Sequence, residues 1–253
     1  MNNISSKAKI GNNVDIKDFV TIDDDVEIGN NVYLGPCVYV GNGSRISDNV
    51  KIFHGGSIAS HPHSTGFADE ISTVEIGEGT LIKEFSTISR ATKYSHRTIV
   101  GKNCYIMNYV HVAHDNIIGD NVVLTNGVGL GGHVTIGSHT TIGGIVGVHQ
   151  FCKIGEYCMI ESNTKVTKDI PPFSLVGRAP QRFIGLNYIG LKRSGFSSEA
   201  ISKIRNAYSI IYDPKLNFKD SLKKLIDEME IKDELKLIHD FIIKSTRGII
   251  PRI

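Results

Sequence analysis

An isoleucine, leucine or valine recurs at every sixth position over most of this 253-residue chain. The repeat runs through residues 4–58, returns over residues 76–88 and continues unbroken over residues 100–166. A period of six matches neither the 3.6-residue period of an α-helix nor the two-residue alternation of a β-strand. It indicates a short strand followed by a turn, used many times, so that stacked units bury one continuous aliphatic column.

Three such units would complete one triangular coil of parallel strands. Glycine follows many of the repeat residues, and we expect these glycines at corners where the backbone adopts unusual φ angles. The sequence therefore predicts a mainly β chain, built as a parallel β-helix over residues 1–175. The chain is long enough to bury a sizeable core of this kind.

Composition limits the partners and the compartment. The net charge of +2 gives no bulk electrostatic case for nucleic acid. The four cysteines have neither metal-site nor disulfide spacing, which predicts reduced thiols in a cytoplasmic protein. No segment reaches the length of a membrane-spanning helix, and the first residues lack the apolar region of a signal peptide. We expect no nucleic-acid partner and no integral membrane segment.

A second region follows the repeat. The repeat stops just before a Pro-Pro dipeptide, which cannot continue a hydrogen-bonded strand. Apolar residues then recur at helical spacing, with Ser197 and Asn217 as predicted N-caps of two helices. A third helix is expected from about Asp233. Residues 190–253 are therefore predicted to form a small C-terminal α-helical domain.

Residues 59–73 and 89–98 interrupt the six-residue repeat. Insertions into a solenoid form loops on one face, and that face is often the binding face. Both loops precede the histidine-rich coils by one or two turns of the solenoid. We therefore expect them to form the walls of a shared cleft.

Four histidines lie next to repeat positions, namely His111, His114, His133 and His149. Because eighteen residues make one coil, His114 and His133 are predicted to lie nearly above one another, with His149 about one coil further. A histidine can act as a general base near neutral pH, since its unperturbed pKa is about 6.5. Four histidines gathered near one edge predict a functional site.

Other groups in the same coils suit this site. Asp115 is placed to orient the neighbouring imidazole, and Asn126 and Gln150 lie nearby. Residues 127–132 match GxGxxG, but a dinucleotide site needs that motif between a strand and a helix, and no helix follows. We interpret the glycines as allowing close approach of an extended ligand. The N–H of Gly132 is a candidate donor to an oxyanion.

At these residues the chain resembles the UDP-N-acetylglucosamine O-acyltransferases of lipid A biosynthesis, the LpxA family of hexapeptide-repeat acyltransferases. The resemblance extends from about residue 100 to the C-terminus and implies a left-handed β-helix, an exception to the usual right-handed crossover. The matching stretches are HVAHD (111–115), GGHV (131–134), VHQFC (148–152), DIPP (169–172), GLKR (190–193), IRNAY (204–208) and STRG (245–248).

The resemblance implies an enzyme that moves an acyl group from acyl carrier protein to a hydroxyl of a UDP-amino sugar, in the first step of lipid A synthesis. It implies a homotrimer with active sites between neighbouring β-helices. It implies no cofactor and no metal, because the acyl donor is carried on the phosphopantetheine of acyl carrier protein.

The resemblance also implies roles for individual residues. His114 would be the general base, Asp115 its support and Gly132 the oxyanion donor. Substrate-binding roles are implied for His111, Asn126, His133, His149, Gln150, Asn187 and Arg193, and a carrier-protein contact is implied for Arg205.

The chain departs from the family pattern on the acceptor side. Ile189 stands where the family has an acidic residue, Ser194 where a second arginine is expected, and Ser89 where a histidine is expected. The first loop reads HPHS at residues 61–64 in place of a Gln-Asp-Leu-Lys-like stretch. These differences leave the identity of the sugar nucleotide open.

Glu161 and Ser162 stand where the family often has paired glycines along the acyl groove. Side chains there predict a shorter groove, and a carboxylate beside an alkyl chain is costly. We therefore expect an acyl group shorter than a fourteen-carbon hydroxyacyl chain. Three alternatives remain: a related sugar-nucleotide N- or O-acyltransferase or acetyltransferase with a shorter acyl donor or acetyl-CoA, a trimeric zinc hydratase of the γ-carbonic anhydrase type, and a scaffold β-helix.

Overall fold

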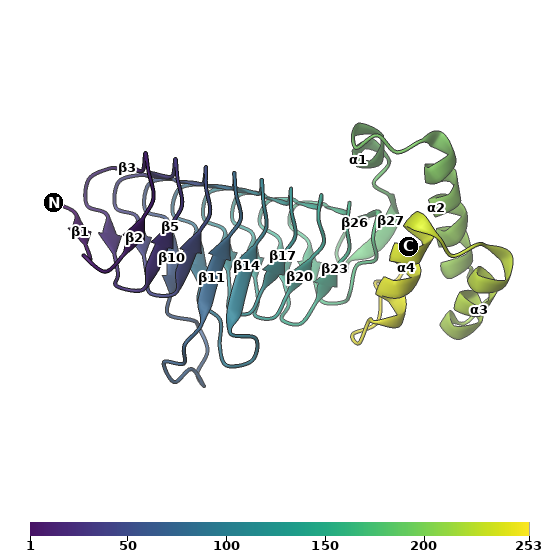
Figure 1. The fold of residues 1–253 in the computed structure, drawn as a ribbon. Coiled ribbons are helices and arrows are strands. Elements are labelled where there is room, and N and C mark those ends of the chain that lie inside the picture. Colours follow the sequence, from purple (N-terminus) through teal and green to yellow (C-terminus); the bar gives the residue numbers. More distant parts are fainter. Residues whose placement is uncertain (253) are drawn as a thin grey trace.

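The computed structural model describes residues 1–252, which form a long coil followed by a group of short helices (Figure 1). Strands of the coil belong to three sheets, here called A, B and C, and up to residue 166 successive strands along the chain belong to these sheets in turn. Sheet A contains β1 (Asn3–Ile4), β4 (Thr21–Ile22), β7 (Tyr39–Val40), β10 (Ser57–Ser60), β13 (Thr87–Ser89), β16 (His111–Val112), β19 (Gly129–Leu130), β22 (Gly147–Val148) and β25 (Lys165–Val166).

The other two sheets complete the triangular coil. Sheet B contains β2 (Lys9–Ile10), β5 (Val26–Ile28), β8 (Ser44–Ile46), β11 (Thr73–Ile76), β14 (Arg97–Val100), β17 (Ile117–Ile118), β20 (Thr135–Ile136) and β23 (Lys153–Ile154). Sheet C contains β3 (Asp15–Ile16), β6 (Tyr33–Leu34), β9 (Lys51–Ile52), β12 (Leu81–Ile82), β15 (Tyr105–Ile106), β18 (Val123–Leu124), β21 (Thr141–Ile142), β24 (Met159–Ile160), β26 (Ser174–Gly177) and β27 (Arg182–Leu186).

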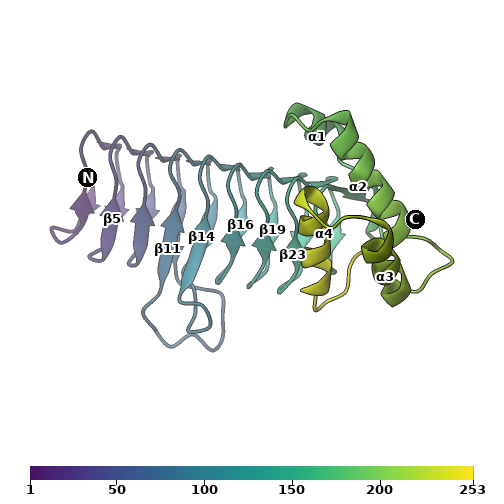
Figure 2. The ribbon, with the colours of Figure 1, turned by 45° about the vertical axis from the view of Figure 1, so that its right-hand side comes forward.

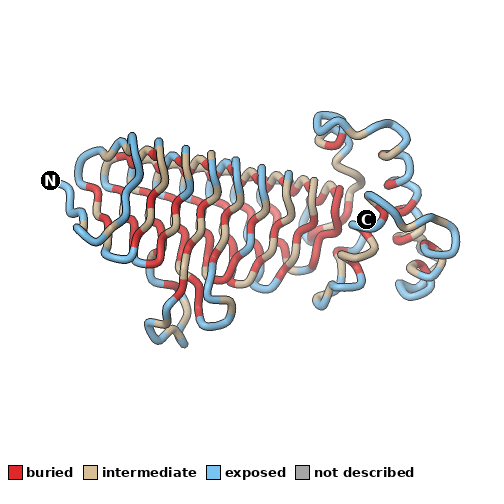
Figure 3. Tube along the Cα trace, viewed as in Figure 1, coloured by how far each residue is buried: buried red, intermediate tan, exposed pale blue. Residues whose placement is uncertain are grey.

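Strand register confirms the predicted parallel β-helix. Val112 pairs with Leu130, and Leu130 pairs with Val148, so each repeat residue lies beside the one eighteen positions later. Repeat residues from Ile22 onward are buried, and they form the aliphatic column inside the coil (Figure 3). Ile4 and Ile10 remain 39% and 37% exposed because the first coil has no preceding coil to cover it.

The expected role of the glycines after the repeat residues is wrong. Gly101 and Gly119 do not adopt left-handed φ angles; instead, a Cβ on Gly101 would lie 2.6 Å from the carbonyl oxygen of Gly119 in the next coil. Glycine is required there by close approach of neighbouring coils. The left-handed φ falls two residues further on, as at Asn103 (51°) and Asn121 (57°), and asparagine tolerates that conformation.

Four helices cover the C-terminal end of the coil: α1 (Tyr188–Arg193), α2 (Ser198–Ile211), α3 (Phe218–Glu228) and α4 (Asp233–Ile243) (Figures 1 and 2). Ser197 and Asn217 are N-caps, as predicted, and accept hydrogen bonds from the N–H groups of Ala200 and Asp220. Helix α1 was not expected, since six residues are too few to show a helical period. Among residues 1–252 no helix is long and apolar enough to cross a membrane.

Side chains tie these helices to the last coil. The Tyr208 hydroxyl on α2 donates to the carbonyl oxygen of Pro172, and the Ser245 hydroxyl donates to Asp169 over 2.7 Å. Strands β26 and β27 continue sheet C from the coil as far as Leu186, immediately before α1. The helices therefore hold a fixed position relative to the last coil.

Candidate functional site

His114 and Asp115 lie in the turn between β16 and β17, at the corner between sheets A and B. Asp115 occupies a corner position with φ of 60°, and its side chain contacts that of the preceding residue. Nδ1 of His114 lies 2.7 Å from Oδ2 of Asp115, and the two side chains are 13% and 1% exposed. With Nδ1–H donated to the carboxylate, Nε2 is the nitrogen free to accept a proton.

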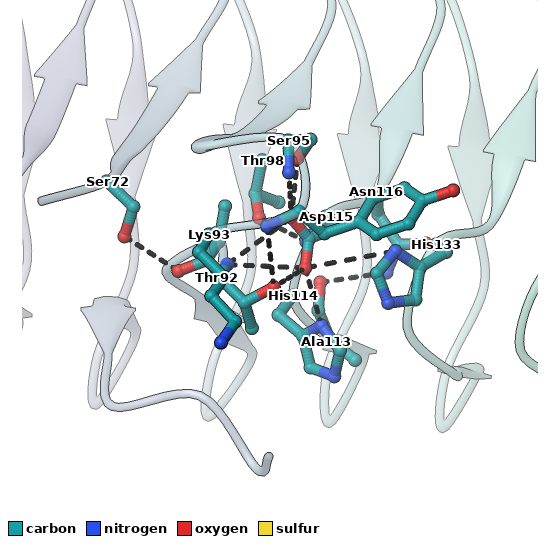
Figure 4. Close-up of polar contacts among 12 residues, drawn as sticks. Ser72, Thr92, Lys93, Ser95, Thr98, Ala113, His114, Asp115, Asn116 and His133 are labelled. Atoms are coloured by element: carbon teal, nitrogen blue, oxygen red, sulfur yellow. Dashed lines mark hydrogen bonds and ion pairs between the residues drawn. The ribbon is translucent and has the colours of Figure 1, made fainter. Parts of the chain in front are cut away.

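The second interruption of the repeat surrounds the Asp115 carboxylate (Figure 4). Thr92 donates from its hydroxyl over 2.8 Å and from its N–H over 3.2 Å, and Ser95 donates from its N–H over 3.1 Å and also from its hydroxyl. Burial opposes the negative charge, but the hydrogen bonds from Ser95, His114 and Thr92 outweigh it and lower the pKa of Asp115. The carboxylate is therefore ionised near neutral pH.

Gly132 lies one coil beyond His114. A Cβ at this position would lie 2.5 Å from Cε1 and 2.8 Å from Nε2 of the imidazole, so only glycine leaves room for the ring. Among residues 1–252 no backbone carbonyl or side chain accepts a hydrogen bond from the Gly132 N–H. The structure thus places an unpaired donor next to the candidate base.

His133 lies one coil beyond Asp115, and its ring centroid is 5.0 Å from that of His114. Phe151 stacks on one face at 4.4 Å, and Tyr94 from the second loop approaches edge-on at 4.5 Å. Burial, opposed by Asp115 and assisted by His114, lowers the pKa of His133. Its Nδ1 is buried and has no hydrogen-bond partner in the described chain; it lies 3.9 Å from Oδ2 of Asp115.

His111 faces outward from β16 beside the first loop. Its Nδ1 lies 2.7 Å from the hydroxyl of Thr87, and its ring stacks on His63 at 5.1 Å. Burial, together with the nearby His63 and His114, lowers the pKa of His111. His111 and His133 are therefore uncharged near neutral pH, when they can both donate and accept hydrogen bonds.

The two loops pack against each other and protrude side by side from the coil (Figures 1 and 2). The N–H of Lys93 donates to Glu70 over 2.8 Å, and the Ser72 hydroxyl donates to the carbonyl oxygen of Ala91 over 2.7 Å. Through His63 the first loop touches one histidine, and through Tyr94 the second touches another. Both predicted cleft walls therefore lie beside the histidine cluster.

His149 and Gln150 follow in the next coil. Gln150 continues the line of His114 and Gly132 at intervals of eighteen residues, and both His149 and Gln150 are exposed. The structure brings His111, His114 and His133 into one cluster. In the described part of the chain, His149 shares no hydrogen bond, ion pair or ring contact with that cluster; its Nδ1 lies 3.0 Å from the carbonyl oxygen of Gln150.

Asn126, Glu161 and Ser162 are exposed at a different corner, between sheets C and A. Ser162 accepts a hydrogen bond from the N–H of Gly144 over 3.1 Å. Ile145, at the same corner, is 74% exposed although it is a β-branched residue with φ of 58°. This corner thus presents exposed polar and apolar side chains that nothing in the described chain covers.

Asn187 and Arg193 lie in a third place. They line a pocket of about 540 Å³ against sheet C, together with Met159. Asn187 caps α1 by accepting from the N–H of Gly190 over 3.1 Å and donates to the carbonyl oxygen of Tyr157 over 2.9 Å, so both of its side-chain groups already serve the fold. Arg205, on α2, lines a separate pocket of about 360 Å³.

His114, Asp115 and His133 offer three possible metal ligands within 4.8 Å of one another. The Asp115 oxygens, however, already accept hydrogen bonds from His114 and from four groups of Thr92 and Ser95. A carboxylate has about four lone-pair sites, so a metal would have to displace these donors. The arrangement fits a histidine–carboxylate base better than a metal site.

Sequence reasoning missed Thr92, Ser95, Tyr94 and Phe151, although it identified the loop that carries the first three. The signals were hydroxyl residues within a loop already expected to face the site and, for Phe151, its place eighteen residues after His133. His63 was noted only as a departure from the family, and its stacking on His111 gives that departure a place in the cluster.

Comparison with known proteins agrees with this geometry. Residues 169–250 match the model of domain 2 of UDP-N-acetylglucosamine O-acyltransferase, and residues 97–132 and 133–168 match the bacterial transferase hexapeptide model. The acyl-[acyl-carrier-protein]–UDP-N-acetylglucosamine O-acyltransferase of Halorhodospira halophila is 40% identical, over 98% of this chain and 96% of its own length. The enzyme of the same name from Campylobacter concisus is 34% identical, over 97% of this chain and 87% of its own.

Solved structures give the same result. The UDP-N-acetylglucosamine acyltransferase of Bacteroides fragilis superposes with a TM-score of 0.95 and 43% identity, covering 98% of both chains. The enzyme of Francisella novicida gives a TM-score of 0.94 and 36% identity, covering 99% of this chain and 92% of its own. Their fold is a left-handed β-helix, which confirms the expected handedness. This chain therefore belongs to the family of acyl-[acyl-carrier-protein]–UDP-N-acetylglucosamine O-acyltransferases.

Proposed function

We propose that the chain transfers an acyl group from acyl carrier protein to a hydroxyl of UDP-N-acetylglucosamine, the first step of lipid A synthesis. The observation that carries the proposal is the buried His114–Asp115 pair with the unpaired Gly132 N–H one coil away. A base and an oxyanion donor at this spacing are what acyl transfer to a hydroxyl requires. Family membership supports the same substrates.

The proposed reaction uses His114 twice. Nε2 takes the proton of the sugar hydroxyl as its oxygen attacks the thioester carbonyl, and the Gly132 N–H stabilises the oxygen that becomes negative. When the tetrahedral intermediate collapses, the C–S bond breaks and the imidazolium returns the proton to the departing thiolate. Asp115 stays ionised throughout and stabilises the imidazolium, because the donors around it hold its charge.

The remaining histidines suit substrate positioning. His111 and His133 stay uncharged near neutral pH, so we assign them hydrogen bonds to neutral groups of the sugar or the thioester arm. The exposed His149 and Gln150 lie one coil further along the same corner, where the extended donor would lie.

We propose a homotrimer with active sites between chains. In one chain the base lies at the corner between sheets A and B, the acyl-groove residues lie at the corner between sheets C and A, and Arg193 lies against sheet C. A neighbouring copy that packs its C–A corner and sheet C beside His114 would complete the site. Burial of the exposed Ile145 in such an interface would account for an apolar side chain at a strained surface position.

A carrier protein with an acidic surface would dock on a basic surface of this chain. Lys165, Lys168, Arg178 and Arg182 surround a pocket of about 420 Å³, and none of the four forms an ion pair within residues 1–252. We propose this pocket, together with Arg205 on α2, as the carrier-protein surface. The phosphopantetheine of the carrier protein brings the acyl group, no further cofactor or metal is proposed, and the reaction takes place in the cytoplasm.

A second candidate is a related N- or O-acyltransferase that uses a shorter acyl donor or acetyl-CoA. The exposed Glu161 and Ser162 at the proposed acyl corner favour a short chain. The deciding experiment offers the purified protein UDP-N-acetylglucosamine or amino-sugar nucleotides with acyl carrier proteins of different chain length or with acetyl-CoA, and identifies products by mass. An ester on UDP-N-acetylglucosamine supports the first function. An amide formed only on an amino sugar, or transfer only from acetyl-CoA, would replace it by the second.

A further inference from the structure

The second loop, residues 89–98, supplies most of the hydrogen bonds to the carboxylate that supports the candidate base. Four of the five groups that donate to the Asp115 carboxylate belong to Thr92 and Ser95, and the fifth is Nδ1 of His114. The Thr92 hydroxyl and His114 share Oδ2, both Ser95 donors reach Oδ1, and the Thr92 N–H lies between the two oxygens at 3.2 and 3.3 Å. The loop therefore holds both carboxylate oxygens, and it does so from outside the regular coil (Figure 4).

This loop is itself held in place. The hydroxyl of Thr92 also accepts from the N–H of Tyr94 over 3.3 Å, and the N–H of His96 donates to the carbonyl oxygen of Thr92 over 2.9 Å. On its other side the loop is fixed to the first loop by Glu70 and Ser72. Thr92 is also buried, so its hydroxyl has little access to water as a substitute partner. The Asp115 carboxylate thus lies in a preformed frame.

We infer that Thr92 and Ser95 are positioning residues for acyl transfer: they fix the Asp115 carboxylate against His114 and moderate how strongly Asp115 holds the imidazole proton. The inference deepens the proposed function and rests on His114 acting as its base. Each hydrogen bond to an ionised carboxylate withdraws part of its negative charge. The four loop donors hold the Asp115 carboxylate in the position where it accepts from Nδ1 of His114.

Removing a loop donor should therefore shift the acidic limb of the kcat/KM profile in a predictable direction. Without the Ser95 hydroxyl, Asp115 keeps more charge for His114, and the imidazolium becomes easier to form. The acidic limb of the kcat/KM profile, where the base becomes protonated, should move to higher pH by on the order of half a unit. Other titratable groups at this place are His133, 3.9 Å from Asp115, and His111 on β16, with Tyr94 against His133 and His63 stacked on His111. Burial first of all lowers the pKa of His133 and of His111, which favours their uncharged forms.

The experiment compares the wild type with Ser95→Ala and Thr92→Val, and uses Ser95→Thr to restore a hydroxyl. Ser72→Ala is the matched control, because it loosens the loop at Ala91 without touching Asp115. The inference predicts a limb shifted to higher pH in Ser95→Ala and Thr92→Val, and a wild-type limb in Ser95→Thr and Ser72→Ala. A uniform loss of rate at every pH, with the limb unmoved, would mean that the loop is only structural and would overturn the inference.

A second measurement separates this inference from the proposed reaction. The His114 imidazole can be titrated by NMR in the folded wild type and variants without any substrate. If His114 titrates at higher pH in Ser95→Ala or Thr92→Val than in the wild type, the loop donors control the His114 proton. A wild type that transfers no acyl group would then overturn only the proposed reaction. An unchanged titration in both folded variants overturns it, whatever the turnover.

Discussion

A methyl group on Gly132 would lie 2.5 Å from Cε1 of His114, in the adjacent coil. The φ angle of Gly132 lies outside the left-handed region, so alanine would strain the imidazole position rather than the backbone. Gly132→Ala should therefore fold but displace the base, and a misplacement of about 1 Å can cost on the order of 100-fold in rate. The measurement compares kcat/KM and the thermal unfolding midpoint of Gly132→Ala with those of the wild type; kcat/KM should fall while the protein remains folded.

Gly185→Ala provides the matched control, since a Cβ there would meet nothing within 4 Å. That variant should keep both activity and stability. If Gly132→Ala also retained wild-type activity, the close packing of its main chain against the imidazole would have no catalytic importance.

Protonation should destabilise the fold on the acid side. Burial is the largest cause of the lowered pKa of His111 and of His133, so the unfolded chain takes up protons on these rings once pH falls below about 6.5, before the folded chain does. Asp115 acts in the same direction at lower pH, because its contribution is present above an unfolded pKa of about 3.9 and is lost as pH falls through its lower folded pKa. Unfolding midpoints measured from pH 7.5 downward should fall.

His133→Phe tests this assignment. Phenylalanine can keep the stack on Phe151 but takes up no proton, so the fall in stability below pH 6.5 should become shallower than in the wild type. An identical slope for wild type and His133→Phe would show that His133 contributes no linkage.

Much of this site follows from arithmetic on the repeat. Asp115 and His133, like His114 and Gly132, are eighteen residues apart, so their contacts could be predicted once the coil length was known. The hydrogen bonds around Asp115 could not be predicted in this way. Ser95 is twenty residues from Asp115 and lies in an interruption of the repeat, where the eighteen-residue coil length does not apply. The corner glycines were misjudged for a related reason: the sequence shows the spacing along a coil but not how closely coils approach.

Sharing of the site between chains predicts complementation. His114→Ala and Arg193→Ala proteins should each be nearly inactive, because one lacks the base and the other lacks a proposed substrate contact. The two residues lie on different sides of one chain, so one site would take them from two chains. After unfolding and refolding as an equimolar mixture, about a quarter of the sites in randomly assembled trimers would combine an intact His114 with an intact Arg193 from a neighbour. Activity near that fraction supports a shared site. No recovery in mixed trimers would place both residues in the same chain's site or remove Arg193 from it.

Side chains at the corner between sheets C and A should limit the length of the acyl chain that the site accepts. Replacing both Glu161 and Ser162 by glycine removes a carboxylate and a hydroxymethyl group from the proposed acyl groove, so longer acyl groups should be accepted. Relative kcat/KM for acyl carrier proteins loaded with chains of increasing length measures the effect. Efficient use of fourteen-carbon chains by the wild type would contradict the short-groove expectation.

The role of His114 as the base is tested most directly by the rate of acyl transfer in His114→Ala, with UDP-N-acetylglucosamine and acyl carrier protein as substrates. His139→Ala is the control, since His139 is exposed at the corner between sheets B and C. Loss of a general base should lower kcat by about 10²–10⁴-fold, while the oligomeric state and unfolding midpoint stay those of the wild type and His139→Ala remains fully active. A His114→Ala protein within a few-fold of the wild-type rate would contradict the proposed mechanism.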